Sequence, residues 1–210
     1  MNQKINDLII RIRELEEEVE REIASRRDQF HFTLEDRRVR FEREVLIQHR
    51  RLKTGILRYL AQARLRNLVS APIIYAVSLP LLLVDLAVTA YQWLCFPLYG
   101  IPRVRRRDYF IFDRSSLAYL NIIEKFNCAY CAYATGLTSY VMEIVGRTEQ
   151  YWCPIKHARR VLEAHSRYER FVDFGDAEAY RAELEALRRD FSLPAAAAPV
   201  GPDPAGNPEH

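Results

Sequence analysis

Glycine is scarce in this sequence, with seven residues in 210, whereas glutamate, arginine, leucine and alanine are abundant. Glycine weakens helices and the abundant residues favour them, so we expect an all-α protein. The first 35 residues also lack an apolar run behind the first basic residue, which excludes a secretory signal peptide. We therefore expect the N-terminus to lie in the cytoplasm.

Cysteine is rare as well, with four residues, of which three fall from position 128 to position 153. They are too few and too clustered for the disulfide framework of a small secreted domain. The sequence has no Asn-x-Ser/Thr acceptor, no glycine-rich phosphate loop after a strand-like run, no His-Glu-x-x-His motif and no Cys-x-x-Cys-His motif. These absences exclude several large enzyme classes and favour a protein that is not an enzyme.

Apolar residues in the N-terminal segment recur at alternating spacings of three and four. They are Ile5, Leu8, Ile12, Leu15 and Val19. This pattern predicts a coiled coil that serves self-association or the capture of a partner protein. The alternative is one solvated helix whose apolar stripe packs on the C-terminal half of the same chain.

Basic residues dominate positions 37–66, where an apolar stripe continues between them, so residues 1–66 are predicted to form a coiled coil followed by a basic amphipathic helix. Such a helix can bind nucleic acid phosphates or an anionic lipid surface. The apolar segment that follows favours lipid and makes nucleic acid the weaker alternative. Basic residues on both sides of that segment are predicted to lie at the membrane surface: Arg50, Arg51, Lys53, Arg58, Arg64, Arg66, Arg103, Arg105, Arg106 and Arg107.

The apolar segment, residues 67–102, is predicted to insert into the membrane, and Asp85 is the only formal charge between positions 67 and 101. A single span over 73–94 measures about 33 Å, which matches a hydrocarbon core of about 30 Å. However, it places Asp85 near mid-membrane at a cost of roughly 2.5 to 3.5 kcal/mol. A helical hairpin folded at 80–85 is favoured because it returns both basic flanks to the cytoplasm. A buried, soluble helical hairpin is the weaker alternative.

Helical periodicity resumes in the C-terminal domain, residues 103–191. The predicted helices cover 117–134, with Ser115 or Ser116 as N-cap, then 137–150, 154–171 and 177–191. The last of these begins after the N-cap Asp176 and the turn residue Gly175. Residues 192–210 are rich in alanine, proline and glycine and are predicted to form a disordered tail.

This domain contains two pairs of residues with the side chains and spacings of metal ligands. Cys128 and Cys131 form a Cys-x2-Cys pair, Cys153 and His157 form a Cys-x3-His pair, and 21 residues separate the two pairs. Because residues three or four apart share one helix face, two antiparallel helices would bring the four side chains to one tetrahedral zinc ion. Pro154 suggests that Cys153 lies at a helix start, where the helix dipole favours the thiolate.

Other interpretations of these residues remain open. Three cysteines and a histidine can hold an iron–sulfur cluster, Cys-x2-Cys alone can be a redox pair, and the residues can also be unrelated buried side chains. Glu124 and Glu149 each precede a cysteine by four residues and are candidates for orienting the metal ligands, although such residues are often simply solvated.

Three stretches carry a resemblance to a known group of proteins. They are Tyr-Gln-Trp-Leu-Cys-Phe-Pro-Leu-Tyr-Gly-Ile-Pro-Arg at 91–103, Asn-Cys-Ala-Tyr-Cys at 127–131 and Arg-Thr-Glu-Gln-Tyr-Trp-Cys-Pro-Ile-Lys-His-Ala at 147–158. With them, the region 79–160 resembles a family of uncharacterised proteobacterial membrane proteins. The resemblance implies a bacterial membrane setting and suggests no mechanism.

The sequence therefore predicts a non-enzymatic adaptor anchored in the bacterial inner membrane, with its zinc-stabilised C-terminal domain in the cytoplasm. A membrane-associated redox protein with an iron–sulfur cluster or a reactive cysteine pair is the alternative. Tethering of nucleic acid through the basic helix is a third possibility.

Overall fold

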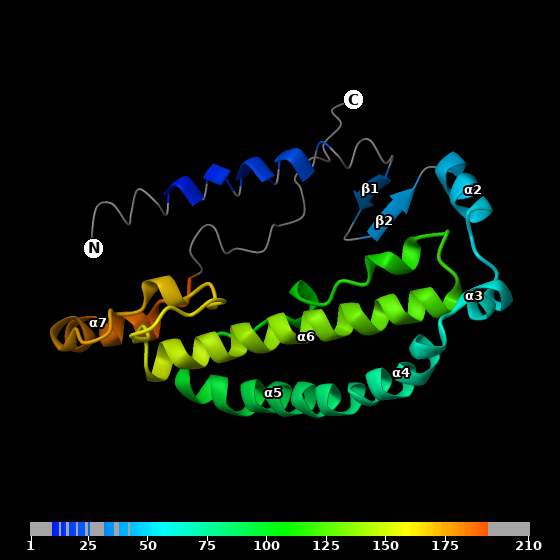
Figure 1. Cartoon of the computed structure of the whole chain (residues 1–210). Helices are drawn as coiled ribbons and strands as arrows, with labels where there is room; N and C mark the ends of the chain where they lie inside the picture. The colour runs from blue at the N-terminus through cyan, green and yellow to red at the C-terminus, as the bar shows by residue number, and fades with distance from the viewer. Residues whose placement is uncertain are drawn as a thin grey trace. The chain divides into compact units, whose positions relative to one another are not determined.

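A computed structural model of the chain describes residues 10–12, 14–15, 17–19, 21–23, 25, 32–35, 38–41 and 43–192. The chain divides into two compact units. Unit 1 comprises Met1–Arg58, Asp113–Lys125 and Val200–His210, and unit 2 comprises Tyr59–Phe112 and Phe126–Pro199. The described residues are mostly helical, as the composition predicts (Figure 1).

Unit 1 contains a short antiparallel strand pair that the sequence analysis missed. The described residues between positions 10 and 25 are helical, and they are followed by β1 (Phe32–Glu35) and β2 (Arg38–Phe41). The register sets Phe32 opposite Phe41 and Leu34 opposite Val39. The sequence alternates apolar and polar residues here with a period of two, which suits a strand better than a helix. The prediction that residues 1–66 are helical throughout is therefore wrong.

The predicted basic helix over 37–66 is also interrupted. Helix α2 covers Arg43–Arg51, residues 52–55 form a break, and α3 covers Ile56–Gln62. Gly55 lies in this break, where a continuous helix would lose about 1 kcal/mol relative to alanine. Arg50 and Arg51 fall in the last turn of α2, where the helix dipole favours positive charge.

Unit 1 also holds the residues that start α6, the longest helix, which covers Ile122–Trp152 and follows the short 3-10 helix η2 (Asp113–Ser116). The side-chain oxygen of Asn121 accepts the backbone N–H of Ile123 and of Glu124, both at 3.0 Å. The Glu124 carboxylate in turn accepts the N–H of Asn121 at 2.8 Å, which completes a capping box. The helix therefore starts five residues later than predicted, with Asn121 as its N-cap instead of Ser115 or Ser116.

In unit 2 the apolar segment forms two consecutive helices, α4 (Leu65–Ala76) and α5 (Ser78–Tyr99), which bend where they meet at Val77 (Figure 1). Pro80 explains the bend, because it has no N–H to donate to the carbonyl four residues before it and its ring crowds that carbonyl. Helix α5 continues without a turn from Ser78 to Tyr99. The favoured hairpin folded at 80–85 is therefore wrong.

Helix α6 packs beside α5 and runs parallel to it, since Tyr75 meets Asn127, Asp85 meets Tyr133, and Gln92 meets Tyr140. Residues 100–112, which we call the return segment, contain the 3-10 helix η1 (Arg106–Asp108) and run back along the two helices. The core between these elements consists of Phe96, Ile101, Val104, Leu137, Tyr140 and Ile144. The two predicted helices 117–134 and 137–150 are thus one helix.

Gly136, where a helix break was predicted, instead lets the return segment approach α6. A Cβ atom at this position would lie 2.7 Å from the backbone oxygen of Tyr109 and 3.2 Å from the Cα of Phe110. No residue other than glycine fits so close to another backbone.

The C-terminal part of unit 2 is irregular up to position 176, apart from a parallel bridge between Ile155 and Val172 and the 3-10 helix η3 (Tyr168–Arg170). The predicted helix 154–171 is therefore wrong. Helix α7 covers Ala177–Arg189, and its N-cap Asp176 accepts the N–H of Ala179 at 2.9 Å, as predicted. Residues 193–210, which are all but the first residue of the predicted disordered tail, lie outside the described residues.

Candidate functional site

Polar side chains occupy the face of α5 that packs inside unit 2. Asp85 is 8% exposed and accepts both ends of the Arg106 guanidinium group and the Tyr133 hydroxyl group, the latter at 2.8 Å. Gln92 is 3% exposed; its oxygen accepts the backbone N–H of Val104 at 3.0 Å and its amide group donates to the Tyr140 hydroxyl. The charge that a single span over 73–94 would place in the membrane core therefore forms a salt bridge within the protein.

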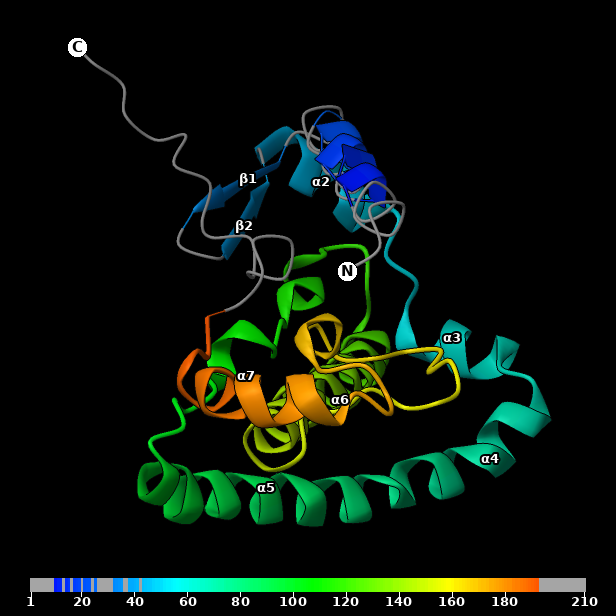
Figure 2. The same ribbon diagram turned by 90° about the vertical axis from the view of Figure 1, so that its left-hand side faces the viewer.

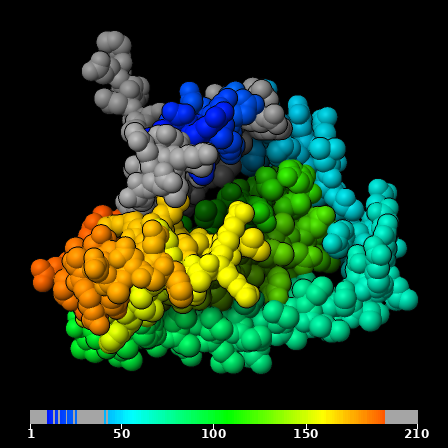
Figure 3. Space-filling model, turned by 60° about the vertical axis from the view of Figure 1, so that its left-hand side comes forward, coloured from blue at the N-terminus to red at the C-terminus, as the bar shows by residue number. Residues whose placement is uncertain are grey.

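The opposite face of α5 is apolar along its whole length and exposed. Its large side chains are between 42% and 78% exposed: Leu79, Leu82, Leu83, Val84, Leu86, Trp93, Leu94 and Leu98. Figure 3 shows α4 and α5 as a continuous band of exposed atoms. We call this surface, together with Leu65, Leu68, Val69 and Ile73 of α4, the outer face.

Among the described residues, one helical stretch, Leu65–Tyr99, is long and apolar enough to cross a membrane. It has 35 residues, and 6% of its most apolar part is buried. Low burial distinguishes this stretch from the core helix of a soluble protein, whose apolar residues are covered.

All ten basic residues predicted to lie at a membrane surface are exposed. Six of them belong to unit 2: Arg64, Arg66, Arg103, Arg105, Arg106 and Arg107. Arg106 also pairs with Asp85, and the guanidinium carbon of Arg103 lies 4.1 Å from the centre of the Trp93 ring, a cation–π contact beside the outer face.

The structure does not bring the four predicted metal ligands together. Cys128 and Cys131 lie on α6, whereas Cys153 directly follows the last residue of that same helix. At a rise of about 1.5 Å per residue, the 22 residues from Cys131 to Cys153 span about 33 Å, whereas zinc–sulfur bonds measure about 2.3 Å. The two antiparallel helices assumed for the site do not form, because α6 is continuous.

Cys153 also lies at the opposite end of a helix from the one predicted. Its backbone N–H donates to the carbonyl of Glu149 at 2.8 Å, which places it at the C-terminal end of α6. Burial and the nearby Glu149 carboxylate raise the pKa of the Cys153 thiol. The predicted stabilisation of the thiolate by a helix N-terminus is therefore wrong.

The remaining predicted site residues have other contacts. His157 is exposed, and its ring stacks on Tyr168 at a centroid distance of 6.2 Å. The Glu149 carboxylate lies 2.9 Å from Nε2 of His165, and Glu124 belongs to the capping box of α6. Within the described part of the chain, no three His, Cys, Asp or Glu side chains are grouped so that they could hold a metal ion. Binding of zinc, or of an iron–sulfur cluster, with ligands from more than one chain stays a prediction.

The chain matches no protein-family model, no curated protein and no solved structure. The resemblance to proteobacterial membrane proteins therefore stays a prediction.

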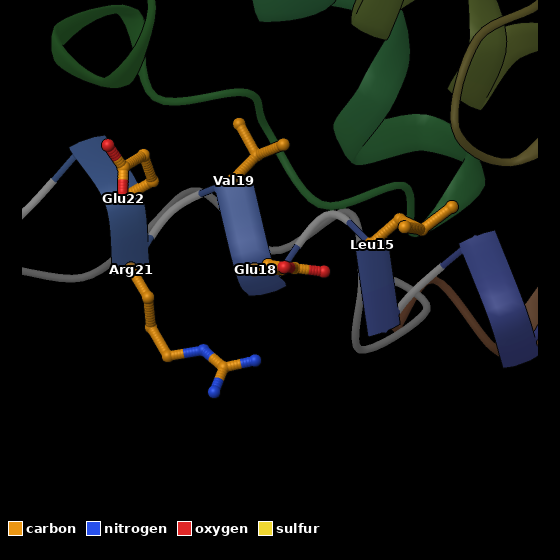
Figure 4. A pocket seen from close by; sticks show the side chains of 5 residues that line it. All are labelled: Leu15, Glu18, Val19, Arg21 and Glu22. Carbon is orange, nitrogen blue, oxygen red and sulfur yellow. The ribbon is translucent and has the colours of Figure 1, made fainter.

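A depression in the N-terminal helical segment of unit 1 is lined by Leu15, Glu18, Val19, Arg21 and Glu22 (Figure 4). Leu15 and Val19 belong to the predicted coiled-coil seam and are 54% and 57% exposed. Ile5 and Leu8, the first two residues of the seam, lie outside the described residues. An exposed seam suits the predicted self-association but does not by itself establish a coiled coil.

A buried polar cluster, which the sequence analysis did not single out, joins the irregular C-terminal segment to α6 and α7. Arg167 is fully buried and donates to Glu143 at 2.8 Å, to Gln150 at 3.0 Å and to the carbonyl of Phe191 at 3.1 Å. Gln150 donates to the carbonyls of Leu187 and Asp190, both at 2.7 Å, and so satisfies the C-terminal end of α7. No spacing or motif in the sequence marks these residues.

Proposed function

We propose that this chain is a membrane-attached adaptor that binds a phospholipid bilayer through its outer face and presents its other segments beside the membrane. The observation that supports this function is the distribution of polar and apolar side chains between the two faces of α5. In soluble proteins the buried face of a helix is the apolar one. In α5 the buried face carries Asp85 and Gln92 beside the core residue Phe96, while the large side chains of the exposed face are all apolar, as is usual for helices surrounded by lipid.

The energy available from the outer face is large. Covering one fully exposed leucine contributes about 1.5 to 3 kcal/mol, and the outer face of α5 has six partly exposed leucines. The arginines beside it favour a lipid surface over a second copy of this chain, because they attract anionic headgroups and would repel the same arginines in a partner.

The N-terminal segment supports the adaptor part of the proposal. Its exposed seam residues belong to unit 1, whereas the outer face belongs to unit 2. One part of the chain can therefore bind lipid while another binds a protein.

Flotation of the full-length protein with vesicles tests membrane attachment. The purified chain is mixed with phosphatidylcholine vesicles that contain phosphatidylglycerol and is centrifuged through a density gradient. We expect the native chain to float in high salt, and the variant Leu83→Asp/Leu86→Asp to stay in the dense fraction. Leu162→Asp is the matched control, since Leu162 is 87% exposed but lies outside the outer face.

The same experiment distinguishes the two possible occupants of the outer face. A native chain that does not float, and that forms a discrete dimer which the Leu83→Asp/Leu86→Asp variant loses, would contradict membrane attachment. It would show instead that a second copy covers the outer face.

A further inference from the structure

We infer that α4 and α5 lie in the plane of the membrane, embedded in one leaflet, and do not cross it. This inference rests on the proposed membrane attachment and specifies its geometry. The stretch is long enough to span the bilayer, but the elements packed against it are not suited to a lipid environment.

The return segment provides the first argument. After α5 ends at Tyr99, the chain runs back along that helix: Val104 bonds to Gln92, and Arg106 bonds to Asp85. In a spanning arrangement over 73–94, this segment would lie at the depth of the hydrocarbon core. It is irregular except for the three residues of η1. Irregular backbone exposed to lipid is not tolerated, because lipid cannot satisfy its N–H and C=O groups.

The charges of the return segment provide the second argument. Arg105 is exposed, and the side chain of Arg107 is 72% exposed. Both flank Arg106, which bonds to Asp85 in the middle of the predicted span. Each arginine facing lipid at that depth would cost roughly 2.5 to 3.5 kcal/mol. Beside a helix lying in the membrane surface, the same arginines meet water and anionic headgroups, where they contribute favourably.

The arrangement of unit 2 provides the third argument. Helices α6 and α7 lie on the same side of α5 in both ribbon views (Figures 1 and 2). The opposite side is the outer face, which extends from Leu65 on α4 to Leu98 on α5. A stretch of 35 residues measures about 52 Å, far more than a hydrocarbon core of about 30 Å requires. An apolar face of this length with α6 and α7 behind it (Figures 1 and 2) fits the surface of one leaflet.

The proposed occupant is therefore a single leaflet that contains anionic phospholipid. The outer face enters the boundary between headgroups and acyl chains, to a depth of roughly 5 to 10 Å. Asp85 then stays on the protein side of the helix, paired with Arg106, and is not placed at mid-membrane.

The sidedness of the two ends of the stretch tests this geometry. Single cysteines replace Gln62 and Arg103, both exposed, in the full chain with its four native cysteines changed to alanine. Arg103 lies beside Trp93, at the far end of the predicted span. Right-side-out and inverted vesicles from expressing cells are treated with a membrane-impermeant maleimide. We expect both positions to be labelled in the same vesicle type and protected in the other. Labelling of the two positions in opposite vesicle types would overturn the inference.

The depth of the outer face is the second measurement. Single tryptophans at positions 79, 86, 93 and 98 are quenched by lipids brominated at different acyl positions. Trp152 is changed to phenylalanine in all four variants, and Trp93 in the variants that carry tryptophan at 79, 86 or 98. A helix in the membrane plane gives nearly equal depths at all four positions. A helix that spans the bilayer over 73–94 places position 86 near the bilayer centre and position 98 about 18 Å farther from it, and that result would also overturn the inference.

Failure of the proposed function has a different signature from failure of this geometry. Absence of the native chain from the membrane fraction and from floated vesicles would refute membrane attachment, and the in-plane arrangement with it. Firm attachment with opposite labelling would refute the in-plane arrangement alone.

Discussion

Arg167 is the residue whose loss should affect stability most. Its guanidinium group is fully buried, and it is held by Glu143, Gln150 and a backbone carbonyl. We expect Arg167→Met to lower the free energy of unfolding by about 3 to 5 kcal/mol, because the buried Glu143 carboxylate loses the positive charge of Arg167. Urea unfolding in mild detergent, followed by circular dichroism, measures this change.

Arg170 provides the control for that substitution. It pairs with Asp190 at the surface, and its side chain is 26% exposed. Surface ion pairs contribute about 0 to 1 kcal/mol, so Arg170→Met should change the unfolding free energy little. Equal effects of the two substitutions would contradict the structural role assigned to Arg167.

The Cys153 thiol should react slowly at neutral pH. Burial and then the Glu149 carboxylate raise its pKa, and only the thiolate is nucleophilic, so less of the reactive form is present at pH 7.5. In a chain that keeps only this cysteine, the midpoint of the pH profile for alkylation by iodoacetamide should lie above the ordinary thiol value of about 8.5.

Replacing Glu149 separates the effect of its charge on the Cys153 pKa from the effect of burial. Glu149→Gln should move the alkylation midpoint to lower pH, whereas Glu163→Gln, an exposed carboxylate in the following segment, should leave it unchanged. A midpoint below the ordinary thiol value would instead support the thiolate predicted from the sequence.

At the scale of elements, packing of the return segment on α6 depends on Gly136. An alanine Cβ there would lie 2.7 Å from the backbone oxygen of Tyr109, and backbone atoms cannot move aside as a flexible side chain can. We expect Gly136→Ala to lower the unfolding free energy by about 1 to 3 kcal/mol, although alanine favours the helix. Gly55→Ala, which meets nothing within 4 Å, should have no such cost in the same urea titration.

Gly136 also shows why some elements could be predicted from the sequence and others could not. Helix α7 was predicted because its cap Asp176, its turn residue Gly175 and its apolar stripe are all local signals. The continuity of α6 was missed because the local signal of Gly136 is a break, and only the distant segment at Tyr109 explains the glycine. A local sequence pattern is enough to identify an element such as α7. It does not reveal a close contact between segments that are distant in the sequence, such as that of Gly136 with Tyr109.

The meeting of the four predicted metal ligands within one chain could not be judged from the sequence for the same reason. A spacing of three or four residues places two side chains on one face of a helix, but it cannot determine whether two such pairs meet. The intervening residues form one helix, so the pairs lie at a distance from each other. The apolar character of 67–102 was recognised correctly because it is a property of composition, whereas the partner of Asp85 was not recognised.

At the scale of the whole molecule, the exposed N-terminal seam predicts that the full chain self-associates. Ile12, Leu15 and Val19 are each between 54% and 57% exposed, at the three- and four-residue spacings that a paired helix covers. We expect Leu15→Lys/Val19→Lys to lower the mass of the detergent-solubilised chain, measured by light scattering after size exclusion, from an oligomer to a monomer. Leu162→Lys adds a positive charge at another exposed leucine and should leave the mass unchanged. A native chain that is already monomeric would contradict self-association through the seam. Flotation of the Leu15→Lys/Val19→Lys variant at the native level would show that lipid binding does not depend on the seam.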